Sequence, residues 1–358
     1  MKKNLLSPIK EILKDAKKGK MFILVDDKDR ENEGDLIIPA SKCNSRSINF
    51  MAIHGRGLIC LALEKNQVVK LSLPLMSSVN KARMQTAFTV SIEAKKGITT
   101  GISAFDRAKT IKVAINSKSK KKDIVSPGHV FPLVARNGGV LERAGHTEAS
   151  VDISRLAKLN PSAVICEVMN EDGRMARLND LLKFSQKHKL RIASIEDLIS
   201  YRLKNEKLII NTNNKVSEIK NHGSFQIKTY KNKLDKFDHY VICKGNFPIK
   251  KPVRVRVISI KIINNKINFN NDILMNSLKY LSKFNNFALI LIRNKNLNNS
   301  KNESLNPKSS NTLRYYGIGA QIIKDLKIKN MILVTRSKKK IIGLEGFGIK
   351  IAKQEIIK

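Results

Sequence analysis

Short apolar runs of strand length recur through the first 170 residues of this chain, and each ends at charged or turn-forming residues. Runs this short fit buried strands better than helices, which need longer periodic segments. Helical spacing over Ile9–Lys17 precedes them, and strands that interleave with helices favour a layered α/β or α+β domain. We expect an α+β fold on a mixed sheet, with strands from Met21–Val25, Leu36–Ile38, Gly57–Leu63, Ala87–Ile92 and Ser162–Met169 and a turn at Asn170–Gly173.

A change in charge divides the 358 residues into two regions. Residues 1–205 hold 21 of the 30 acidic and 37 of the 68 basic side chains, whereas the remainder holds 9 and 31 and is rich in asparagine. The change follows a helical segment, Ile195–Arg202, and leads into the polar run Asn211–Lys215. We therefore expect a first domain over 1–205, a linker over 206–220 and a second domain over 221–358.

The formal net charge of +38 would suit a protein that binds nucleic acid. However, the lysines are scattered, arginine-rich blocks are absent, and aromatic residues make up only 5% of the chain. We attribute the charge to overall composition and expect no nucleic-acid partner, although a basic surface would help to gather an anionic substrate. A nucleic-acid-binding protein remains the alternative from another functional class, and steeply salt-dependent DNA binding would support it.

Cysteine usage and the N-terminus indicate the cellular compartment. The four cysteines are widely spaced and form no CxxC pair, which argues against a disulfide framework and a local zinc knuckle. The segment Met1–Leu6 lacks the long apolar stretch of a signal peptide or membrane span. We expect a cytoplasmic enzyme with no membrane partner.

Six carboxylates crowd the ten residues from Asp26 to Asp35, directly after the first expected strand. Close carboxylates suit a hard cation such as Mg²⁺, which prefers oxygen ligands. A solvated acidic turn is the commoner outcome for such a segment. Here Arg30, Asn32 and Gly34 interleave with the acids and offer a grip on a phosphate or hydroxyl, which favours a metal-assisted site.

Small and polar residues combine in a second segment, Gly138–Ala149. Arg143 can hold a phosphate, and Thr147 can cap a helix whose N-terminus favours an anion. His146 supplies an imidazole for metal binding or proton transfer. A lone histidine is usually structural, but its Arg-x-Gly-His-Thr-Glu surroundings favour a functional one.

Two more groups are candidates for proton transfer. His129 is bracketed by two prolines in Ser126–Pro132, which predicts a stiff loop that could hold a general acid or base. By itself this motif fits a turn histidine equally well. Glu167 interrupts the apolar run Ser162–Met169, where a carboxylate must be paired, otherwise satisfied or functional.

In their order along about Lys10–Arg202, these segments resemble the 3,4-dihydroxy-2-butanone 4-phosphate synthase family of riboflavin biosynthesis. The resemblance includes Cys166–Glu167 and extends to His54–Cys60, Phe88–Val90, Gly97–Arg107 and Asp172–Arg177. It implies conversion of D-ribulose 5-phosphate to L-3,4-dihydroxy-2-butanone 4-phosphate and formate. It also implies a homodimer with active sites at the subunit boundary, so that His129 could act on the neighbouring subunit's site.

The resemblance also assigns roles to single residues. Glu31 and His146 would bind Mg²⁺ or Mn²⁺, and His129 and Glu167 would be essential for catalysis. Three neighbouring carboxylates, Asp26, Asp27 and Asp29, would be local scaffold. The substrate-binding set would be Arg30, Glu31, Asp35, Arg143, Ala144, Gly145, His146, Thr147 and Glu167, with Ala144 standing where many family members have glycine.

The second region resembles GTP cyclohydrolase II, an α/β-type domain, in Lys251–Arg256, Leu313–Ile323 and Gly343–Ile349. That enzyme binds zinc through three cysteines, but only Cys243 lies in this region, and one thiol cannot make such a site. We therefore expect a cyclohydrolase-like domain without zinc.

Two further positions bear on the activity of this domain. Thr312 stands where the family's acidic catalytic residue is expected, although Arg314 is retained. We expect a catalytically inactive domain that serves dimerisation or stability, in preference to nucleotide-dependent regulation or to a decaying remnant. A bifunctional enzyme that also hydrolyses GTP is the alternative.

Overall fold

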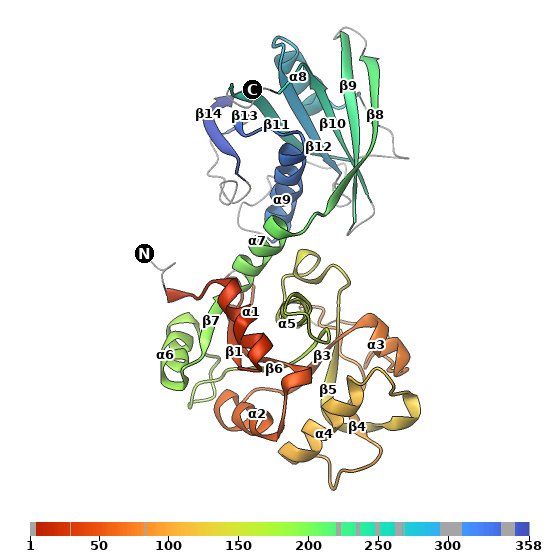
Figure 1. The fold of residues 1–358 in the computed structure, drawn as a ribbon, viewed down its shortest axis with the longest axis vertical. Coiled ribbons are helices and arrows are strands. Elements are labelled where there is room, and N and C mark those ends of the chain that lie inside the picture. The colour runs from red at the N-terminus through yellow and green to blue at the C-terminus, as the bar shows by residue number, and fades with distance from the viewer. Residues whose placement is uncertain are drawn as a thin grey trace. The chain divides into compact units, whose positions relative to one another are not determined.

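The computed structural model describes residues 5–28, 30–81, 84–219, 223–233, 237–247, 251–261, 267, 269–293, 310–337 and 348–357, with only the backbone of 310–316. The chain forms two compact units, residues 1–199 and 200–358, each built around a seven-stranded mixed sheet (Figure 1). The expected combination of helices and mixed sheets is therefore confirmed. Within the described residues, no helix combines the length and apolar character that a membrane span requires.

Helices and strands alternate along the first unit, as the apolar runs predicted. The strands are β1 (Phe22–Val25), β2 (Gly34–Pro39), β3 (Cys60–Glu64), β4 (Ile92–Ala94), β5 (Ile124–Ala135), β6 (Ser162–Glu167) and β7 (Arg191–Ser194). The α-helices are α1 (Ile9–Lys18), α2 (Ser45–Phe50), α3 (Lys65–Lys70), α4 (Ala104–Ala114), α5 (His146–Leu156) and α6 (Leu178–His188), and α7 (Ile195–Asn205) crosses into the second unit.

The first sheet has the order β4-β5-β3-β6-β2-β1-β7. Pairs β3–β5 and β1–β7 are parallel and the other neighbours are antiparallel. Side chains alternate between faces along each strand. One face packs against α2, α3, α4 and α6 through a core that includes Ile23, Leu36 and Leu61. On the other face, Ala62 and Ala135 pack against Val151 of α5.

Two expected elements of this unit differ in the structure. The His129 segment is part of β5 and is not a loop. Prolines normally exclude a segment from a sheet interior, but here Pro127 lies where the β4–β5 ladder is interrupted. In the expected strand Ala87–Ile92, only Ile92 belongs to β4, while Phe88 and Thr89 make isolated bridges to Leu133 and Leu75.

The second unit contains β8 (Ile209–Ile219), β9 (Gly223–Asn232), β10 (Asp238–Lys244), β11 (Val253–Ile260), α8 (Asp272–Leu281), β12 (Phe287–Arg293), α9 (Ser310–Asp325), β13 (Asn330–Thr335) and β14 (Lys350–Ile356). Its sheet order is β14-β13-β11-β12-β10-β9-β8. Most of the segment expected as a linker, 206–220, is therefore the edge strand β8. The prediction failed because most side chains of β8 are exposed or half-buried, so its composition is that of a polar connection.

Candidate active site

Most candidate residues converge on one edge of the first sheet, where β1 and β6 end and the antiparallel strand β2 begins. The strand register sets this arrangement: Asp35 of β2 pairs with Leu24 of β1 on one side and with Glu167 of β6 on the other. Glu167 is the last residue of β6 and does not lie in the middle of the strand as expected. Because Asp35 and Glu167 are direct partners on neighbouring strands, their side chains share one face of the sheet.

The acidic segment between β1 and β2 is folded around the carboxylate of Asp26, whose side chain is fully buried. Its Oδ2 accepts hydrogen bonds from Arg30 Nη1 at 2.8 Å and from the Glu31 backbone N–H at 3.2 Å. Its Oδ1 accepts from the Glu33 N–H at 2.8 Å. This carboxylate therefore fixes the backbone that carries Glu31.

Arg177 holds the same loop from outside. Its Nη1 donates to the backbone oxygens of Glu31 at 2.6 Å and Asn32 at 2.8 Å. Asn32 adopts a left-handed backbone conformation with φ of 56°, which asparagine tolerates better than most residues. Arg177 lies within the Asp172–Arg177 motif, but no sequence pattern indicated that it binds this loop.

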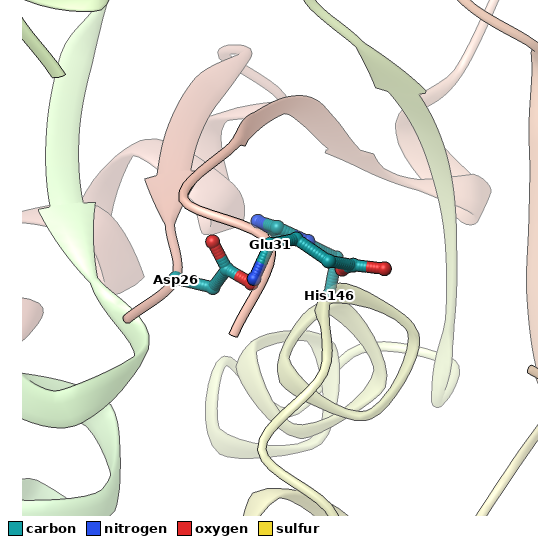
Figure 2. A group of neighbouring side chains, drawn as sticks. All are labelled: Asp26, Glu31 and His146. Atoms are coloured by element: carbon teal, nitrogen blue, oxygen red, sulfur yellow. The ribbon is translucent and has the colours of Figure 1, made fainter. Parts of the chain in front are cut away.

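Asp26, Glu31 and His146 form a group suited to a cation. One ligand atom from each side chain lies within 4.8 Å of the others, and Figure 2 shows the three side chains converging from the loop and from the start of α5. The group contains both predicted metal ligands. It also contains Asp26, which we expected to be scaffold only. In the structure, Asp26 both holds the loop and places a carboxylate oxygen close to the potential ligand atoms of Glu31 and His146.

His146 is the first residue of α5 and is buried. Its Nε2 lies 3.2 Å from the carbonyl oxygen of Leu24, an acceptor, so we assign the ring proton to Nε2. Nδ1 then keeps its lone pair and lies 3.6 Å from Asp35 Oδ1. Burial lowers the pKa of His146 and favours the neutral imidazole, the form that ligates a metal.

Asp35 and Glu167 add buried negative charge beside this group. Burial, followed by repulsion from Glu167, raises the pKa of Asp35 well above its usual range. Burial also raises the pKa of Glu167, and repulsion from Glu31 adds to the effect. Asp35 Oδ1 is buried without a hydrogen-bond partner among the described residues. An unpartnered carboxylate oxygen among several acids is what a divalent cation would neutralise, so these residues fit a cation.

Glycine at position 57 lets Glu167 approach the start of β3 closely. Glu167 Oε2 accepts a hydrogen bond from the Leu58 N–H at 2.9 Å. A Cβ at Gly57 would lie 2.6 Å from that Oε2 and 2.8 Å from the Glu167 nitrogen, too close for any side chain. Gly57 belongs to the resemblance motif, but only the structure reveals its role in holding this carboxylate.

The predicted phosphate-binding residues lie at the start of α5. Gly145 is the N-cap residue, and Thr147 is the second residue of the helix. Thr147 is therefore not the cap that we expected, because the N-cap residue, Gly145, lies two positions earlier and the helix already begins at His146. Ala144 is half-buried, next to Arg143, whose Nη1 donates to Glu148 Oε2 at 2.6 Å. The guanidinium also donates to the backbone oxygen of Met84 at 3.0 Å.

His129 stands apart from these residues along the same edge. At the start of β3, Cys60 pairs with Phe131 of β5 and with Ile165 of β6. His129 and Glu167 each lie two residues beyond those partners, on opposite sides of β3. Two strand spacings, roughly 10 Å, therefore separate them. His129 instead contacts Glu93 of β4, a residue to which the sequence drew no attention.

Comparison with known proteins identifies the family. Residues 10–201 match the family described as 3,4-dihydroxy-2-butanone 4-phosphate synthase. The chain belongs to this synthase family. Residues 212–356 match the family described as GTP cyclohydrolase II. The predicted two-part resemblance is confirmed, and the chain is a lyase of riboflavin biosynthesis.

Relatives with both parts include proteins named for one activity or for the pathway. This synthase is 44% identical to riboflavin biosynthesis protein RibBA of Aquifex aeolicus, over 98% of this chain and 92% of that protein. It is 38% identical to RibBX, a two-domain 3,4-dihydroxy-2-butanone 4-phosphate synthase from A. baumannii, with a TM-score of 0.84. The match covers 98% of this chain and 100% of that chain. A 3,4-dihydroxy-2-butanone 4-phosphate synthase structure in complex with two magnesium ions is 37% identical, with a TM-score of 0.54. The match covers 56% of this chain and 98% of that chain.

The second unit of this synthase offers different chemistry. Among its described residues, no group of three potential metal ligands comes together. Cys243, on β10, is buried, and burial raises the pKa of its thiol to about 11. Residues 294–309 and 338–347, and the side chains of Thr312 and Arg314, lie outside the described residues. The expectation about the acidic catalytic position therefore stays a prediction.

Proposed function

We propose that the site at the edge of the first sheet converts D-ribulose 5-phosphate to L-3,4-dihydroxy-2-butanone 4-phosphate and formate, with Mg²⁺ or Mn²⁺ held by Glu31 and His146. The observation that carries this proposal is the convergence of Asp26, Glu31 and His146 beside the unpartnered Asp35 oxygen. A family relative that holds two magnesium ions supports the choice of metal.

Substrate binding divides between the cation group and helix α5. A divalent cation held here supplies positive charge to the substrate's oxygens. Arg30 and Asp35 face the sugar from the acidic loop and β2. Arg143, Ala144, Gly145 and Thr147 lie next to the N-terminus of α5, where free backbone N–H groups and the helix dipole favour the phosphate.

Proton transfer falls to Glu167 and His129. The reaction removes a proton from C1, eliminates the C1 hydroxyl as water, moves the carbon skeleton and releases C4 as formate. Burial raises the pKa of Glu167, which favours a carboxyl that can hold a proton and return it during the reaction. Because β3 separates His129 from Glu167, we propose that His129 serves the neighbouring subunit's site in a cytoplasmic homodimer.

For the second unit we propose a stabilising or dimerising role without zinc and without GTP hydrolysis. Two apolar clusters of buried residues, one including Val255 and Ile290 and the other Leu274 and Leu289, support a folded domain. Its single cysteine cannot supply a three-thiolate zinc site.

The direct test measures formate release from ribulose 5-phosphate with Mg²⁺, beside GTP turnover with zinc. We expect formate from the sugar phosphate, its loss with EDTA and its return with Mg²⁺. Absence of formate from ribulose 5-phosphate would overturn the proposed reaction. Formate released from GTP would overturn the proposal for the second unit and establish a bifunctional enzyme.

A further inference from the structure

The side chain of Glu93 meets the ring of His129 across the first sheet's outer strand pair. Glu93 is the central residue of β4, and its Oε1 contacts His129 Nδ1. The Glu93 side chain is 15% exposed, whereas that of His129 is 44% exposed. The carboxylate is therefore mostly enclosed, while the imidazole is open to solvent. This arrangement suits a histidine that contacts substrate and is held in place by a buried carboxylate.

A bulge in β5 brings the two side chains together. Val125 pairs with Glu93 and Val130 with Ile92. Because Ile92 and Glu93 are adjacent in β4, residues 126–129 of β5 are extra residues between these two pairs and form the bulge. The Gly128 N–H donates to Ser91 Oγ at 3.1 Å and anchors this bulge to the segment before β4. Bulges of this kind redirect side chains, and they are frequent beside active sites.

Two glycines make room for the Glu93 carboxylate. A Cβ at Gly101 would overlap its Oε1, and Gly101 also has a φ of 88°, which disfavours other residues. A Cβ at Gly128 would overlap the Ile92 backbone and the Glu93 side chain. A surface ion pair formed by chance needs no such accommodation, so the enclosure of this carboxylate separates the pair from an ordinary exposed contact.

We propose that Glu93 is a positioning residue for His129, an inference that rests on the catalytic role proposed above for that histidine. A carboxylate accepts a hydrogen bond, so it fixes the ring proton on Nδ1 and leaves the Nε2 lone pair facing outward. Nε2 can then take a proton from the substrate, and the carboxylate stabilises the imidazolium that results. In this role Glu93 orients the ring and transfers no proton itself.

Substitution of Glu93 in the full chain tests this role. In Glu93→Gln, we expect kcat for formate release to fall about 10- to 100-fold, with KM changed less than about 3-fold, because the amide can hold the ring in the wrong tautomer. Glu93→Asp should recover part of the loss. The matched control is Glu64→Gln, which removes a carboxylate of β3 paired with Arg155 at 2.5 Å and should leave kcat unchanged.

A double-mutant cycle with His129→Gln separates positioning from other effects. If Glu93 acts through His129, Glu93→Gln should reduce activity less than about 2-fold in the His129→Gln background. Equal losses in both backgrounds, or full activity of Glu93→Gln in a wild-type background, would overturn the inference. Full activity of His129→Gln alone would instead overturn the catalytic role proposed for the histidine.

The histidine tautomer gives a readout that a purely structural role would not move. In ¹⁵N-histidine-labelled protein, the His129 signal is identified by its loss in His129→Gln. We expect the Nδ1–H form in the wild type and a mixture or the Nε2–H form in Glu93→Gln. An unchanged tautomer in Glu93→Gln would contradict the inference.

Discussion

Among the described residues, the first sheet carries a buried aspartate and the second sheet a buried arginine, and each has side-chain atoms that lack a hydrogen-bond partner. Asp35, on β2, is 3% exposed and lacks a partner for Oδ1. Arg256, on β11, is 4% exposed and lacks partners for Nε and Nη1 among the described residues. Burial, followed by repulsion from Arg336, lowers the pKa of Arg256 to about 10.

The surroundings of the two groups differ in what they could bind. Asp35 lies beside His146 and Glu167. These carboxyl and imidazole groups are all potential metal ligands, and a bound cation would offset the energetic cost of burying the carboxylates together. Arg256 instead has another arginine, Arg336, as the charged neighbour that lowers its pKa, so two like charges lie near each other. A buried charge marks a working site only when the neighbouring groups complement one ligand.

The largest expected effect is the loss of activity when the cation group is removed. Glu31→Gln and His146→Ala should each reduce formate release at least about 1000-fold, because both remove a proposed metal ligand. Circular dichroism spectra should match the wild type. Retention of more than a small fraction of the wild-type rate would remove that residue from the metal site.

Arg256→Met tests whether the buried charge of the second unit only costs stability. Two donor atoms of Arg256, Nε and Nη1, lack partners among the described residues. Replacing this buried charge by an apolar side chain should therefore raise the free energy of unfolding by about 1–2 kcal/mol, measured in urea. The control on the same strand is Arg254→Met. Arg254 pairs with Glu355 at 2.9 Å and lies 3.6 Å from the Phe284 ring centroid, so its loss should lower stability. A similar loss for Arg256→Met would contradict the comparison.

Asp35→Asn makes the corresponding test in the first unit. Because the folded protein holds the Asp35 proton at pH values where the unfolded chain has lost it, wild-type stability should fall as pH rises through the window above 3.8. The variant lacks this dependence and should be more stable by about 1–2 kcal/mol in EDTA at pH 8. Added Mg²⁺ should stabilise the wild type more than the variant. Identical pH profiles in EDTA would contradict this.

The smallest expected effect is the response to nucleotide. If the second unit serves stability or dimerisation, millimolar GTP should shift the melting temperature of the full chain by less than about 1 °C. A saturable shift that Arg256→Met abolishes would instead show that Arg256 binds a phosphate. That outcome would make the two buried charges equivalent as ligand sites.

The sequence predicted the strands with continuous apolar runs, because burial on both faces leaves a clear pattern in β1, β2, β3 and β6. It did not predict β8, whose exposed side chains look like a connection, or the path of β5 through two prolines. Motif chemistry indicated Glu31 and His146, which the structure brings together. Their convergence with Asp26 depends on loop hydrogen bonds that no local pattern encodes.

Other site contacts were beyond the sequence for a similar reason. The Glu93–His129 contact joins residues 36 positions apart, and it forms only because of an irregular ladder. Gly57 leaves room for Glu167, and Arg177 holds the backbone of the Glu31 loop, so both residues act on segments distant in the sequence. Such contacts depend on tertiary packing, whereas sequence patterns report mainly local structure.

The Asp35–Glu167 register also limits how this family can change length. Shifting a strand by one residue turns all of its side chains to the opposite face. A single insertion or deletion within β2 or β6 would therefore send one carboxylate into the apolar core on the other side. We expect length differences among related chains to occur in the turns and loops between strands. The strands β2 and β6 themselves should keep the same number of residues.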